Sequence, residues 1–108
     1  MMKMLVELDE NKILREGKYN LAKMNAFISN AFEKRNMVKD AENWYVNGNF
    51  ESCGSLALIL SHKEWFMTNV KRWLWYDEAD DSTEDLKAHY SNERIRCEII
   101  GGKKCLRN

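Results

Sequence analysis

The sequence predicts an α+β fold, in which two to three helices pack on a short antiparallel sheet with strands near both termini. Two patterns carry this prediction. Apolar and polar residues alternate near both ends of the chain, and apolar residues recur at helical spacing between them. The length of 108 residues suits a small single domain, residues 1–108, because domains commonly hold roughly 100 to 150 residues.

The composition indicates a folded chain without net charge. Apolar residues make up 44% of the chain, and 17 basic side chains balance 17 acidic ones. A neutral chain has no general attraction to nucleic acid or to an anionic membrane. No stretch approaches the roughly 20 apolar residues of a membrane span, and the first apolar run is too short for a signal peptide. We therefore expect a cytoplasmic protein with no membrane partner.

The chain begins with a predicted strand. Residues 3–8 (KMLVEL) alternate between apolar and polar side chains, as in a half-buried strand. Residues 9–12 then suit a turn, because they are all polar or charged. Residues 13–14 return as a second short strand before Gly17 interrupts it.

A helix over residues 21–35 follows, because apolar side chains recur every three or four positions and Asn20 is a good N-cap. Residues 37–45 either continue this helix or form a second short one. Asn47 and Gly48 then mark a turn that either closes a hairpin or ends a helix. The flanking strands of such a hairpin would be very short, which favours the helix end.

Residues 55–76 are the apolar centre of the chain and hold three of its four tryptophans. Helix formers dominate residues 55–70, which form one long helix, or two pieces if Ser61 and Glu64 make a capping box. The side chains expected to turn inward are Leu56, Leu60, Phe66 and Val70. Residues 71–76 are rich in aromatics and predict a strand.

The last part of the chain is predicted to hold a helix and a hairpin. Ser82 or Thr83 caps a short helix that runs to Tyr90. Residues 94–106 then form a hairpin around the two-residue turn Gly101-Gly102. A helix over residues 92–100 is the alternative, although its β-branched isoleucines disfavour it.

The aromatic strand and the acidic run after it are the candidate functional site. Trp73 and Trp75 are two residues apart, so on a strand both side chains face one way and Tyr76 faces the other. If only one of these faces meets the core, the other leaves large aromatics near solvent, where binding hot spots form. The adjoining acids would offer a phosphate-like surface to a basic groove. The predicted partner-binding residues are Trp73, Trp75, Tyr76, Asp77, Glu78, Asp80 and Asp81.

The ordinary alternative is that both faces of this strand are covered and that the acids are a solvated loop. We nevertheless expect a small non-enzymatic protein that binds another protein or a second copy of itself. The chain lacks proline and is rich in asparagine, lysine and isoleucine, which suits an AT-rich bacterial or mobile-element source. An accessory protein, or an inhibitor of a host nucleic-acid-handling enzyme, is one concrete version of this function.

A second hypothesis is a nucleic-acid-binding module at the C-terminal hairpin. Five basic residues there outnumber two acidic ones, and a basic hairpin can lie along phosphates. The basic residues are Arg94, Arg96, Lys103, Lys104 and Arg107. No aromatic residue lies among them for base stacking, so a solvated edge strand is the ordinary alternative.

A third hypothesis is a thiol enzyme centred on Cys53. This cysteine lies among small residues just before a predicted helix, whose N-terminus would lower the pKa of the thiol, and His62 or His89 would complete a dyad. The same residues with Cys97 and Cys105 lack the spacing of a zinc site. The acidic run also lacks the pattern of a calcium loop. We expect no metal and no cofactor.

Overall fold

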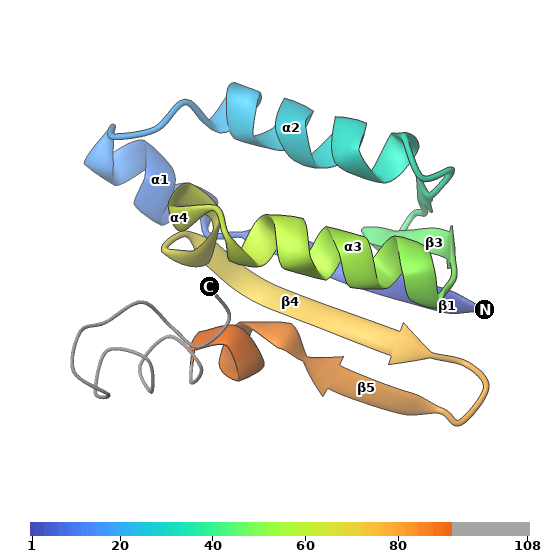
Figure 1. Cartoon of the computed structure of the whole chain (residues 1–108). Coiled ribbons are helices and arrows are strands. Elements are labelled where there is room, and N and C mark those ends of the chain that lie inside the picture. Colours follow the sequence, from blue (N-terminus) through green and yellow to red (C-terminus); the bar gives the residue numbers. More distant parts are fainter. Residues whose placement is uncertain (92–108) are drawn as a thin grey trace.

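The computed structural model describes residues 1–91 of the chain. Its elements, labelled in Figure 1, are β1 (Met2–Leu8), α1 (Glu10–Glu16), α2 (Leu21–Glu33), β2 (Val38–Lys39), β3 (Trp44–Gly48), α3 (Phe50–Ser61), α4 (Glu64–Met67), β4 (Val70–Asp77) and β5 (Ser82–Asp85). Residues 86–91 are helical. The predicted α+β class is confirmed.

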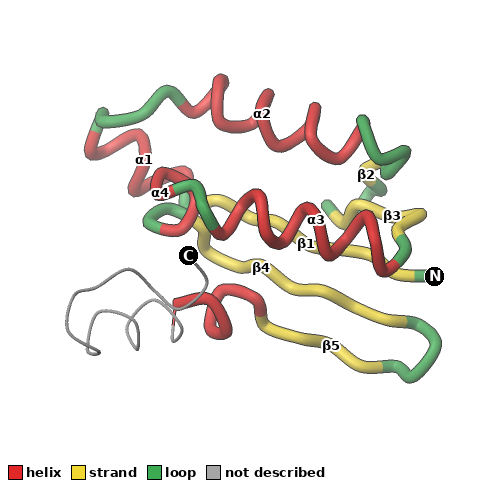
Figure 2. Tube along the Cα trace, viewed as in Figure 1, coloured by secondary structure: helices red, strands yellow, loops and turns green. Residues whose placement is uncertain are grey.

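The strands form one antiparallel sheet in the order β2-β3-β1-β4-β5, which Figure 2 shows in yellow. The first strand is therefore central: β1 pairs with β3 on one side and with β4 on the other. The β1–β4 ladder runs from Met2 opposite Asp77 to Leu8 opposite Val70. Strands predicted over residues 3–8 and 71–76 are thus confirmed, and they lie side by side.

The described helices cover one face of this sheet (Figure 1). Residues directly opposite in a ladder share a face, so Met4 and Val6 lie beside Trp75 and Trp73 on the covered face. This helix-covered face carries the core, which is closed by side chains of α2, α3 and α4 and by Leu86. We call the opposite side the helix-free face, because none of the described helices packs on it.

The helix expected over residues 21–35 is present as α2, whereas the helical region expected over residues 55–70 begins earlier, at Phe50, and ends at Met67, so that Val70 already belongs to β4. Asn20 accepts a hydrogen bond from the Lys23 amide through its side chain, as an N-cap does. The second region forms two pieces, α3 and α4. The four side chains expected to turn inward, Leu56, Leu60, Phe66 and Val70, are all buried. The predicted Ser61–Glu64 capping box is wrong, because the Ser61 hydroxyl donates to the Leu58 carbonyl instead.

Residues 9–17 were predicted to form a turn and a return strand, which is wrong. They form α1, which Asp9 caps by accepting from the Lys12 amide. Gly17 ends this helix in the left-handed conformation, with a φ of 61° and its amide bonded to the Ile13 carbonyl. The sequence contains both the N-cap residue Asp9 and the C-cap residue Gly17. The helix between them buries a single side chain, that of Ile13.

The helix expected over residues 37–45 is also wrong. Asn36 takes a φ of 60°, and the Met37 amide bonds back to the Phe32 carbonyl at 3.1 Å. This left-handed residue ends α2 and sends the chain into β2 and β3. Met37 itself is fully buried.

Asn47 and Gly48 neither close a hairpin nor end a helix, so both predicted alternatives are wrong. They are the last residues of β3, where Asn47 has a φ of 69° and the ladder with β1 shifts register. A side chain at Gly48 would lie 2.8 Å from Cys53 Sγ and from Met37 Cε. This close approach favours glycine at position 48, because a larger residue would force the neighbouring side chains to shift.

The predicted start of the last helix is wrong as well. Ser82 and Thr83 do not cap it; they lie in β5, opposite Asp77 and Tyr76. The helix begins at residue 86, and the Asp85 carboxylate accepts from the Ala88 amide. The hairpin predicted over residues 94–106, and the helix that competes with it over residues 92–100, lie outside the described residues.

Two glycine substitutions test the packing at β3. Gly48→Ala should lower the free energy of unfolding by about 1–3 kcal/mol, because the added methyl group overpacks a site closed by Cys53, Met37 and the Met2 carbonyl. Gly54→Ala, inside α3 where an added methyl group meets no atom within 4 Å, should raise it by about 0.5–1 kcal/mol. Urea unfolding measures both. Equal stabilities for the two variants would contradict this packing.

Candidate protein-interaction surface

The tryptophans of β4 lie on the helix-covered face. Trp73 is 0% exposed; its ring packs against Phe66 and its indole N–H points to Met4 Sδ at 3.3 Å. Trp75 is half-buried, and its indole N–H points to Met2 Sδ, also at 3.3 Å. A partner therefore has no access to Trp73 in this fold, and it reaches only part of Trp75.

Tyr76 lies on the helix-free face, as the alternation along β4 predicted. Its cross-strand neighbour is Lys3, and Trp44 in β3 lies on the same face because it pairs with Leu5. The Lys3 ammonium lies 4.6 Å from the centre of the Trp44 ring and 5.3 Å from that of Tyr76. We call Lys3, Trp44 and Tyr76 the aromatic–lysine cluster. Cation–π contacts of this kind contribute about 0.5–1 kcal/mol each at exposed sites.

The surroundings of this cluster are mixed in character. Leu5 lies between Trp44 and Leu74 in the ladders and is only 3% exposed, so the neighbouring long side chains cover it. Further along the same strands, Glu7 and Arg72 form an ion pair of 3.5 Å with both side chains about half exposed. Such an exposed pair adds little stability. The face therefore combines aromatic, aliphatic and charged groups without a covering helix in the described chain.

The acidic turn adjoins the cluster directly. It comprises residues 77–81, from Asp77 at the end of β4 to the residue before β5, and the Tyr76 hydroxyl donates to Asp81 Oδ1 at 2.6 Å. The Asp77 carboxylate accepts from the Ala79 amide, and Asp80 accepts from the Ser82 hydroxyl. These bonds connect carboxylates of the turn to its own backbone and to the first residue of β5. The structure thus brings Tyr76 together with Asp77, Glu78, Asp80 and Asp81, and it places Trp73 on the other side of the sheet.

The pKa of Tyr76 lies above that of an ordinary tyrosine. The main cause is its hydrogen bond to Asp81, followed by partial desolvation and by the negative charges of Asp81, Glu78 and Asp77. Each of these effects opposes the formation of a phenolate. The aromatic and acidic parts of the surface are therefore electrostatically coupled.

Cys53 lies inside α3 and not before a helix, which corrects the expected placement. Its side chain is fully buried, and this burial raises the pKa of the thiol, although a hydrogen bond with Ser52 partly opposes the shift. A buried cysteine with a raised pKa does not suit a thiolate nucleophile. His62, at the end of α3, is exposed, and its Nδ1 lies 2.7 Å from the Leu58 carbonyl.

Other expected site residues lie outside the described chain. These are the basic residues Arg94, Arg96, Lys103, Lys104 and Arg107, and the cysteines Cys97 and Cys105. Within residues 1–91, no three cysteine, histidine or acidic side chains are grouped closely enough to hold a metal ion. In the same range, no helix has the length and apolar character needed to cross a membrane.

The sequence did not indicate that Lys3 and Trp44 belong to the surface. Lys3 was recognised only as a polar position of the first strand, and Trp44 lies about 30 residues before Tyr76 in the sequence. Only the order of the strands, with β1 between β3 and β4, brings the three side chains together.

A titration of Tyr76 tests the link to the acidic turn. The phenol should ionise at a higher pH than an ordinary tyrosine, as measured by the ultraviolet absorbance of tyrosinate, with Tyr76→Phe identifying its transition. The contribution of the Tyr76–Asp81 contact to stability is complete below the ordinary tyrosine pKa, near 10, and is lost as the pH rises through the raised value.

Asp81→Asn removes the charge and keeps a residue that tolerates the local φ of 51°, so the pKa of Tyr76 should fall back towards its ordinary value. Glu33→Gln, on the exposed side of α2, is the matched control and should leave the titration unchanged. An unaltered Tyr76 transition in Asp81→Asn would show that the hydrogen bond is absent in solution.

Comparison of the chain with models of protein families, with curated proteins and with solved structures found no match.

Proposed function

We propose that this protein works by binding another protein through the helix-free face, with the aromatic–lysine cluster at the centre and the acidic turn at the edge. The observation that carries the proposal is the half-buried pair Trp44 and Tyr76 with the Lys3 ammonium between them. Tryptophan and tyrosine are the residues most enriched at binding hot spots, where both rings and polar tips contribute.

The rigidity of the cluster supports the same proposal. Lys3, Trp44 and Tyr76 stand on three adjacent strands, and Tyr76 is also bonded to the acidic turn. Side chains that are already held in place lose little conformational entropy when a partner binds. A flat sheet face of this kind suits a partner that is itself a folded protein.

The negative charge beside the cluster indicates the charge of the partner's surface. Four carboxylates of the turn and those of Glu84 and Asp85 lie along the β4–β5 hairpin. A concentration of negative charge steers a basic surface into contact and speeds association. The more specific proposal is a cytoplasmic accessory protein, from a bacterium or mobile element, that inhibits a host nucleic-acid-handling enzyme by occupying its basic groove.

Photo-crosslinking tests this proposal in cells that make the protein naturally. A photoreactive phenylalanine at Thr83, an exposed position opposite Tyr76 on the helix-free face, should form an adduct with one defined protein. The same group at Glu33, on the exposed side of α2, should not form that adduct. An adduct with a second copy of the chain, confirmed by sedimentation of the purified protein, would identify self-association instead.

Affinity measurements with the captured partner then test the residues. Trp44→Ala should weaken binding by about 30-fold or more, as truncation of a hot-spot aromatic does. Phe50→Ala is the matched control, because this exposed aromatic of α3 lies on the other side of the sheet, and it should have little effect. Equal losses for the two variants, with both still folded, would refute a binding site on the helix-free face.

A further inference from the structure

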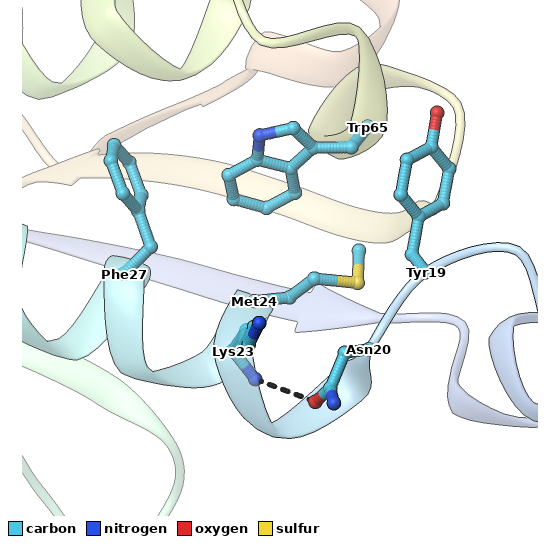
Figure 3. A pocket seen from close by; sticks show the side chains of 6 residues that line it. All are labelled: Tyr19, Asn20, Lys23, Met24, Phe27 and Trp65. Carbon is cyan, nitrogen blue, oxygen red and sulfur yellow. Dashed lines mark hydrogen bonds between the residues drawn. The ribbon is translucent and has the colours of Figure 1, made fainter.

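A concave site lies on the helix-covered side of the molecule, between the start of α2 and α4 (Figure 3). It has a volume of about 290 Å³ and is lined by Tyr19, Asn20, Lys23, Met24, Phe27 and Trp65. This volume lies at the low end of the range for small-molecule sites, so it suits a ligand of one or two rings. We call it the α2–α4 pocket.

Aromatic rings form its walls. In Figure 3, Tyr19 and Phe27 stand on either side of the Trp65 indole, and the Met24 side chain lies between them. The Phe27 and Trp65 rings meet edge to face, with centroids 5.4 Å apart. Phe27 is 37% exposed, so a ligand in the pocket can reach its ring. The walls would contact a flat aromatic ligand through faces and edges that are already in place.

Hydrogen-bond donors at the pocket are unused within the described chain. Trp73 and Trp75 point their indole N–H groups to methionine sulfurs, whereas the Trp65 indole N–H has no acceptor among residues 1–91. The Tyr19 hydroxyl likewise has no partner there. Both side chains are partly exposed, so these donors are accessible, and an acceptor oxygen of a bound ligand would give them a partner.

Three lysines lie at or beside the pocket. Lys23 lines it directly, the Lys63 ammonium lies 5.2 Å from the centre of the Phe27 ring, and the Lys18 ammonium lies 5.9 Å from that of Tyr19. The first turn of α2 carries no acidic residue, and no acidic side chain lines the pocket. A ligand with a negative charge therefore complements this site.

We propose that the α2–α4 pocket binds a small planar aromatic carboxylate. The ring would lie among Phe27, Trp65 and Tyr19, and the carboxylate would face Lys23. Aromatic contacts and unused donors select a flat ligand with acceptor oxygens, and the lysines select its negative charge. This site is independent of the proposed protein-binding surface, because it lies on the helix-covered side of the sheet.

Nitrogen-15 NMR of the indole N–H signals tests the proposal with 2-naphthoate as the probe. The Trp65 signal, identified by its loss in Trp65→Phe, should shift and saturate with a dissociation constant near ~1 mM, the affinity expected for a probe of this size. The neutral isostere 2-naphthylmethanol should bind at least about fivefold more weakly, because it lacks the charge.

Two substitutions and one control variant test whether the probe binds in the α2–α4 pocket. Phe27→Ala should weaken naphthoate binding about tenfold through the lost ring contact, and Lys23→Met about two- to fivefold through the lost charge. Lys71→Met, an exposed lysine of β4 away from the pocket, should leave it unchanged. An unshifted Trp65 signal, an equal affinity for the neutral alcohol, or unaltered binding in both pocket variants would each overturn the proposal.

Discussion

The central position of β1 is the constraint on which the rest of the structure depends. Because β1 is paired on both edges, its alternate side chains organise both faces of the sheet. On one face, Met2 and Met4 receive the indole N–H groups of Trp75 and Trp73 and fix these large rings beneath the helices. On the other face, Lys3 draws together two rings from the flanking strands. This one strand of seven residues thus contributes side chains to both the core and the candidate surface.

Short-range sequence patterns identified the helices and strands that are determined by residues close to each other in the chain. The Asn20 cap, the helical spacing after it and the alternation of residues 3–8 and 71–76 each act within a few residues, and all are present in the structure. The wrong predictions concern segments whose structure depends on contacts with residues far away in the sequence. Gly48 has the sequence signature of a turn residue, but in the structure it lies in a strand, where the close approach of Cys53 and Met37 from other segments favours glycine. Residues 82–85 looked like a helix start, but pairing with β4 makes them a strand.

The candidate sites were predictable only in part for the same reason. Alternation separated Tyr76 from its neighbouring tryptophans, yet it did not say which face the helices would cover. That choice depends on the total apolar surface of the sheet, including Val6 and Tyr45 from other strands. The α2–α4 pocket left no signal in the sequence, because its walls come from residues about 40 positions apart that meet only when the helices pack.

Pairing of β1 with β4 also has a consequence for folding during synthesis. A ribosome makes the apolar strand β1 before either of its partners, so both edges of β1 are unpaired until β3 is made, and one edge stays unpaired until residues 70–77 follow. Closure of this long-range ladder makes assembly slower than for a chain of local contacts. The nascent chain is therefore most exposed to aggregation, and most dependent on chaperones, in the interval before β4 emerges.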